Sequence, residues 1–298
     1  MRPYIGGQPS AGLLLLRAMC RNTGCVGAAF APGLCQVIRD YCGYNSRLQK
    51  GGALLDDMRM LVSNWSGESA SHQAEAAVVM NLLGKVTRAR AADTYRRAFL
   101  PRFIKGDPPC AWRIARELED RNLPLEVIRP VYYWITARSE RLLYDFVADA
   151  IVGRLGNHDQ SVRTDETSAW ITARLKKCGK VWSPTVTTKV ARGMLAALRD
   201  FGILEGAVKK RIAPAYVPVE AFAYLAFAIH AQGASGHSLV NHPDWALFLS
   251  TSGTVEHQFL EADRNDLLTY QAAGNIIRVD FPACSYKEMA DVVAARAH

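Results

Sequence analysis

The chain has 298 residues, of which 49% are hydrophobic and 21% are charged, so it can bury a sizeable core in two or three small domains. This composition excludes a disordered protein, and no run approaches the roughly 18–20 apolar residues of a membrane helix. Thirty-six Lys and Arg against 28 Asp and Glu give a net charge of +8, which favours an anionic partner.

Residues 1–42 are dense in Gly and Cys and have poor helical periodicity, so we predict a tail, either disordered or added by an upstream start codon. The seven cysteines are odd in number and include no CxxC pair, which predicts free thiols in a reducing, cytoplasmic location. A disulfide cluster within the tail is the alternative. The cysteines are Cys20, Cys25, Cys35, Cys42, Cys110, Cys178 and Cys284.

Apolar residues at helical spacing dominate residues 43–160 and predict an N-terminal helical bundle. We expect helices over 54–62, 71–85, 87–104, 111–121, 125–137 and 140–155. Pro and Gly clusters such as 106–109 separate them, and 156–161 resembles a linker.

Residues 161–215 predict a compact basic domain of the winged-helix type. A helix from about Thr164 ends at Gly179, and a second begins with Ser183 as its N-cap and Pro184 in its first turn. Gly202 closes the second helix, and a hairpin over 203–212 follows. Residues 169–212 hold ten Lys or Arg and two acids, a net charge of +8.

This charge predicts a helix-turn-helix that binds duplex DNA mainly through its phosphates. Thr185, Thr188, Lys189 and Arg192 would contact the groove, and Ser183 with the helix N-terminus would hold a phosphate. The backbone-contacting and wing residues would be Lys176, Lys177, Lys180, Lys209, Lys210 and Arg211. The alternative is a solvated helix face, which we disfavour because three consecutive elements share one sign of charge.

Residues 216–298 predict a C-terminal helical module with a β-hairpin. A helix over 219–231, a loop over 233–242, helices over 245–249 and 255–264, and strands over 267–271 and 276–281 are expected. This order repeats that of the basic domain, but residues 213–298 carry four basic and nine acidic side chains.

Catalytic signatures are missing from the sequence. It contains no GxxxxGK[ST], HExxH or GxSxG motif, and we expect no enzymatic activity, cofactor or metal. His230, His237 and His242 are close in sequence, but packing or surface roles are favoured over a metal site.

Three segments resemble the BrxA family of bacterial BREX phage-defence systems, long catalogued as a domain of unknown function and sometimes labelled inner-membrane proteins. They are Gly51-Gly-Ala-Leu-Leu-Asp-Asp-Met-Arg-Met, Ile135-Thr-Ala-Arg-Ser-Glu-Arg-Leu-Leu-Tyr-Asp-Phe-Val, and Trp182 with Lys189, Leu195, Leu198 and Gly202-Ile-Leu. The resemblance covers about 44–212. It implies a mainly α protein with a NusB-like bundle followed by helix-turn-helix modules, acting beside other BREX proteins and without enzymatic activity.

The combined prediction is a non-enzymatic protein that binds double-stranded DNA within a BREX system. Two rivals stay open. An RNA-binding NusB-like protein would place its contacts on Arg88 to Arg102, which lie in a second basic stretch of the sequence. Lys189 would then make no contribution to binding. A scaffold subunit would dock partner proteins through its acidic C-terminal module.

Overall fold

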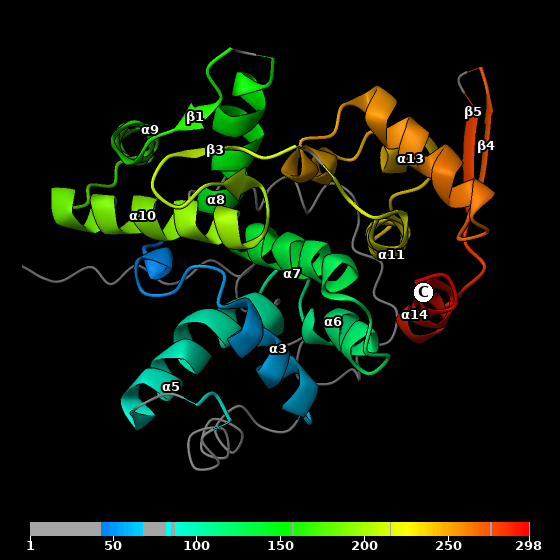
Figure 1. Cartoon of the computed structure of the whole chain (residues 1–298), viewed down its shortest axis with the longest axis horizontal. Coiled ribbons are helices and arrows are strands. Elements are labelled where there is room, and N and C mark those ends of the chain that lie inside the picture. Colours follow the sequence, from blue (N-terminus) through cyan, green and yellow to red (C-terminus); the bar gives the residue numbers. More distant parts are fainter. Residues whose placement is uncertain are drawn as a thin grey trace, which may run out of the picture. The chain divides into compact units, whose positions relative to one another are not determined.

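Helices make up most of the described chain between residues 43 and 160 (Figure 1). The computed structural model describes residues 43–67, 82–84, 87–156, 158–214, 216–274 and 276–297, which lie in one compact unit, Tyr41–His298. The elements here are η1 (Arg47–Gln49), α3 (Leu55–Asn64), α5 (Arg88–Thr94), η2 (Tyr95–Ile104), α6 (Trp112–Glu119), α7 (Leu125–Ser139), α8 (Arg141–Asp145), η3 (Phe146–Ile151) and η4 (Val152–Arg154). The predicted tail and most of the predicted helix over 71–85 lie outside the described residues.

The core of this bundle is an aromatic column on η2. Tyr95, Phe99 and Phe103 are all buried, and their neighbouring ring centroids are 5.8 and 5.7 Å apart. The element η2 is a π-helix that continues α5 directly, and it contains Pro101, which cannot donate a backbone hydrogen bond. The predicted helix over 87–104 is present, but the break expected at or near Pro101 was wrong, because the helix continues through Pro101 to Ile104 as a π-helix.

A buried ion pair fastens the segment around η1 to the bundle. The Nε atom of Arg102 donates to Glu140 at 3.2 Å, and both side chains are 1% exposed. The remaining nitrogens of Arg102 donate to the carbonyls of Gly51, Gly52 and Ala53 at 3.0–3.3 Å. Glu140 has φ −110° and ψ 78°, so the helix predicted over 140–155 begins only after this residue.

The basic region consists of two helices and a small antiparallel sheet. Its elements are β1 (Ser161–Val162), α9 (Thr164–Lys177), α10 (Pro184–Asp200), β2 (Leu204–Glu205) and β3 (Lys210–Ile212). The strand order is β1-β3-β2, with Ser161 opposite Arg211 and Leu204 opposite Ile212. The predicted linker over 156–161 was wrong at its last residue, because Ser161 begins β1. A strand of two residues carries no alternating pattern that a sequence could reveal.

Local signals and one close contact fix α10. The Ser183 hydroxyl accepts from the Val186 backbone at 3.4 Å, and Gly202 with φ +83° follows the helix, as predicted. A Cβ atom on Gly193 would lie 1.9 Å from the carbonyl oxygen of Leu48. Glycine at this position therefore lets α10 pack directly on the backbone of η1.

The C-terminal region wraps further elements around a fully buried helix. They are α11 (Val219–His230), α12 (Gly236–Val240), η5 (Pro243–Phe248), α13 (Ser252–Arg264), β4 (Thr269–Ala273), β5 (Ile276–Asp280) and α14 (Tyr286–Ala294). Every residue of α11 from Ala221 to Ile229 is buried, as its uniformly apolar sequence predicts. The predicted loop over 233–242 was wrong, because a capping box at Ser235 and Ser238 starts α12. The helix α14 was not predicted.

A buried carboxylate joins the C-terminal region to the bundle. Asp244 in η5 is 0% exposed and accepts hydrogen bonds from Trp134 at 2.8 Å, Tyr144 at 3.0 Å and Arg138 at 3.1 Å. Burial disfavours the charged carboxylate, but the positive charge of Arg138 and the hydrogen bonds from Trp134 and Tyr144 outweigh it, so the pKa of Asp244 lies below its ordinary value. This residue holds η5 against α7 and α8.

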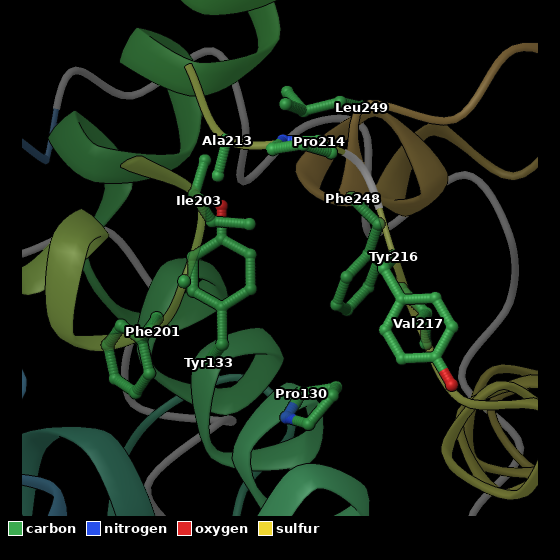
Figure 2. Close-up of a pocket in the computed structure, with 11 residues that line it drawn as sticks. Pro130, Tyr133, Phe201, Ile203, Ala213, Pro214, Tyr216, Val217, Phe248 and Leu249 are labelled. Carbon is green, nitrogen blue, oxygen red and sulfur yellow. The ribbon is translucent and has the colours of Figure 1, made fainter. Parts of the chain in front are cut away.

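Only a small cavity interrupts the packing at the same junction. Figure 2 shows Tyr133, Phe201 and Ile203 on one side of it and Phe248 on the other. Its volume of about 30 Å³ is too small for more than a water molecule. The junction is therefore a packed interface and not a ligand site.

Candidate nucleic-acid interface

One face of α10 points to solvent along the whole helix. Thr185, Lys189, Arg192 and Arg199 recur at spacings of four, three and seven residues and are all exposed. On the opposite side Val190, Met194 and Leu198 are fully buried. The predicted groove-contacting residues thus share one surface, although Thr188 at its edge is half-buried.

Five predicted contact residues have cationic side chains with no ion-pair partner within the described part of the chain. They are Lys176, Lys177, Lys189, Arg192 and Lys209, and all five are exposed. They come from the end of α9, from α10 and from the loop between β2 and β3. An uncompensated cation on a surface carries its full charge toward an incoming anion, so these five supply most of the positive field here.

Other predicted contact residues have intramolecular partners. The ammonium of Lys180 donates to the Tyr44 carbonyl at 3.2 Å, and that of Lys210 donates to the Ala207 carbonyl at 2.9 Å. Arg211 forms an ion pair with Glu205, directly opposite it in the sheet. These three side chains stabilise the turn and the hairpin; Glu205 neutralises Arg211, whereas Lys180 and Lys210 keep their charge but are held by backbone carbonyls.

The N-terminus of α10 is suited to an anion. No acidic residue lies in its first turn, and the Ser183 cap and Thr185 are exposed. The N–H groups of a first helical turn have no partner in the helix, and the helix dipole adds positive potential at this end. The adjacent exposed hydroxyls can donate to the same phosphate oxygens.

The histidines and cysteines have structural surroundings. His230 contacts the Ala234 carbonyl at 2.8 Å, and the His242 ring accepts from the Asp244 backbone at 3.3 Å. No group of three metal-ligating side chains is found among the described residues. Cys110 and Cys284 are thiols. Cys178 is disulfide-bonded, so the prediction of a free thiol was wrong at this position. Sequence spacing alone does not reveal such a pairing.

Sequence reasoning found only part of a second group of cations. The side chains of Arg47, Lys50, Arg90, Arg97 and Arg102 line a cavity of about 520 Å³ between the η1 segment and the helix α5–η2. The two contributing segments are some forty residues apart in sequence. The only local signal was the helical spacing of arginines after residue 87, and it gave no indication of Arg47 or Lys50.

Membrane insertion finds no support in the described part of the chain, where no helix is both long and apolar enough to cross a bilayer. No curated protein and no solved structure matches the chain. The model of the BrxA family matches residues 43–228, which is more than half of the sequence and includes the bundle, the basic region and most of α11. The chain therefore belongs to the BrxA family, and this membership implies a component of a BREX phage-defence system.

Proposed function

We propose that this protein binds double-stranded DNA for a BREX defence system through α9, α10 and the β2–β3 hairpin. The observation that carries the proposal is the set of five exposed cations on these three elements that have no ion-pair partner among the described residues. A polyanion is the partner that compensates so many like charges, and an exposed helix can enter the major groove of a duplex, which is about 12 Å wide.

The order of the elements supports a winged-helix arrangement. A strand, two helices and a hairpin follow one another, and β3 lies between β1 and β2 in the sheet. In this proposal residues 161–215 form the DNA-binding domain, 43–160 form a NusB-like bundle, and 216–298 form a third module. The helix α10 takes the recognition role and the loop before β3 takes that of the wing.

The contacts divide by chemistry. Lys189 and Arg192 lie near the middle of α10 and would reach base edges or phosphates in the groove. Ser183, Thr185 and the α10 N-terminus would hold one phosphate, and Lys176, Lys177 and Lys209 would contact phosphates on either side. Since most of these contacts are to phosphate, we expect affinity to exceed sequence specificity.

We further propose that the protein has no catalytic activity and acts with other BREX proteins in the cytoplasm, where the duplex lies. The described surface is distinguished by its pattern of cations and not by an arrangement of nucleophiles or bases. Lys180, Lys210 and Arg211 then serve mainly to fix the geometry of the domain.

Fluorescence anisotropy with a labelled duplex of about 20 base pairs tests the proposal. Five phosphate contacts correspond to a log–log salt slope of about −4.5, or roughly 500-fold weaker binding between 50 and 200 mM salt. A salt-independent affinity for the duplex would count against it. Binding of single-stranded RNA with the same salt dependence, unchanged by a substitution at Lys189, would also count against it.

A further inference from the structure

One cavity of the bundle is strongly cationic. Five basic side chains surround about 520 Å³, namely those of Arg47, Lys50, Arg90, Arg97 and Arg102, and Asp93 is the one acid in the lining. A volume of this size is typical of small-molecule sites. Its described lining comes from the η1 segment and from α5 and η2, and includes no residue of α10.

Intramolecular partners neutralise only part of this charge. Asp93 is shared between Lys50 at 3.5 Å and Arg97, and Glu140 is shared between Arg47 at 3.3 Å and Arg102 at 3.2 Å. Arg90 has no partner among the described residues and is exposed. Five cations therefore share two carboxylates, which leaves three positive charges around one cavity.

The cations differ in what they can offer. Arg102 uses its guanidinium on Glu140 and on three backbone carbonyls, so it shapes the wall of the cavity. Lys50 and Arg97 are about half exposed and are held only by the shared Asp93. Arg90 and these two side chains can therefore turn toward a ligand without breaking a buried interaction.

We propose that this cavity binds the phosphate chain of a small ligand, a di- or triphosphate, either free or as part of a nucleotide. Arginine guanidinium groups bind phosphate oxygens in pairs, and lysine adds a point charge. The other described residues of the lining are Gly51, Leu54, Thr94 and Ala98, and none of these has an aromatic ring on which a base could stack. The site therefore recognises the phosphates and discriminates little between bases.

Isothermal titration calorimetry of the full chain tests this site with tripolyphosphate, ATP, GTP and inorganic phosphate as separate titrants. We expect tripolyphosphate, ATP and GTP to bind with affinities within about threefold of one another, and inorganic phosphate at least tenfold more weakly, since it spans fewer cations. Tight ATP binding without tripolyphosphate binding would overturn the phosphate-chain assignment. No heat with any of these at millimolar concentration would overturn the site itself.

Variants locate the binding. Replacing both Arg90 and Arg97 (R90Q with R97Q) should weaken tripolyphosphate binding by about tenfold or more, whereas Asp93→Asn should tighten it, because it releases Lys50 and Arg97. Arg96→Gln is the matched control, an exposed arginine on the same helix that does not line the cavity. All four positions are solvent-accessible, so the variants should keep the wild-type circular dichroism spectrum. If Arg96→Gln weakened tripolyphosphate binding equally, the effect would come from general surface charge and not from the cavity.

Duplex DNA is the competing occupant, and its phosphates offer the same chemistry. If R90Q with R97Q lowered duplex affinity as strongly as tripolyphosphate affinity, the cavity would belong to the DNA path and the small-ligand proposal would fall. We expect instead that this double variant changes duplex affinity by less than threefold.

Discussion

The basic region and the C-terminal region present the same order of elements with opposite charge. Each has a capped helix followed by an antiparallel hairpin, namely α10 with β2–β3 and α13 with β4–β5. The exposed side of α10 carries Lys189 and Arg192, whereas that of α13 carries Glu256 and Glu261. Similar local architecture thus leaves the surface charge free to differ, and that charge decides which of the two regions can meet a polyanion.

Packing differs between the two regions as well. The hairpin β2–β3 is held by the extra strand β1, whereas β4–β5 is two-stranded and leaves Ile276 75% exposed. The C-terminal region is instead fastened through the buried Asp244 and through α14, where Arg121 of the bundle pairs with Asp291. We therefore expect mutations in the links between the C-terminal region and the bundle to lower stability more than mutations in the β2–β3 hairpin.

The largest effect is expected at Asp244. Asp244→Ala would remove the acceptor of the buried Trp134 N–H and one of the two carboxylates that pair with Arg138, at a cost of about 2–4 kcal/mol in the free energy of unfolding. Chemical denaturation measures this, and Asp266→Ala, which removes a carboxylate with a 78% exposed side chain, is the control and should cost less than about 1 kcal/mol. Equal costs would mean that the buried network adds nothing.

The same network predicts a pH dependence. Because the pKa of Asp244 is lowered in the folded state, its contribution to stability is present above the unfolded pKa of about 4 and is lost as the pH falls through the folded value. The midpoint of denaturation should therefore fall more steeply below pH 4 in the wild type than in Asp244→Asn.

Charge reversal tests which region meets DNA. Lys189→Glu with Arg192→Glu should weaken duplex binding about 100-fold at 100 mM salt and flatten the salt slope by at least two. The mirrored change, Glu256→Lys with Glu261→Lys, should leave affinity the same or slightly higher. If the mirrored pair instead abolished binding, the acidic region would hold the site.

Two helical glycines compare the packing of α10 with that of α13. Gly193→Ala should destabilise the protein by about 1–3 kcal/mol, because its Cβ would overlap the Leu48 carbonyl oxygen. A Cβ on Gly253 in α13 would meet nothing within 4 Å, so Gly253→Ala should be neutral or stabilising by up to about 1 kcal/mol. Thermal unfolding of both variants checks the contrast, and a stable Gly193→Ala variant would show that η1 can move away.

The smallest effect is expected at the hairpins. Glu205→Gln should release Arg211 and tighten duplex binding about two- to fivefold, with a change in stability below about 0.5 kcal/mol since the pair is exposed. Asp280→Asn breaks the corresponding pair with Arg278 on the second hairpin and should leave affinity unchanged. A tighter Asp280→Asn variant would place part of the DNA path there.

Local signals account for most of what the sequence could predict. The start and end of α10 follow from Ser183-Pro184 and Gly202, and the buried α11 follows from its unbroken apolar run. The strand β1 could not be predicted, because its two residues pair with a strand about fifty residues later. The helix α12 depends on a cap of two serines, which resembles an ordinary turn in sequence.

The candidate interface divides in the same way. Counting charges identified the basic region and its exposed cations, since these depend only on residue type and helical spacing. Whether a cation has an internal partner depends on the tertiary fold, as Lys180 on Tyr44 shows. The cationic cavity was invisible for the same reason, because two distant segments create it.

The close contact between Gly193 and Leu48 fixes one side of α10 and leaves its exposed face free. The proposed groove-contacting residues on that face all lie in the first nine residues of the helix, Pro184 to Arg192. Nine helical residues span roughly 14 Å, which matches about four base-pair steps along a duplex axis. A single copy of the proposed DNA-binding domain would thus read a very short footprint, and a longer recognition sequence would require a second copy or a partner protein placed alongside it.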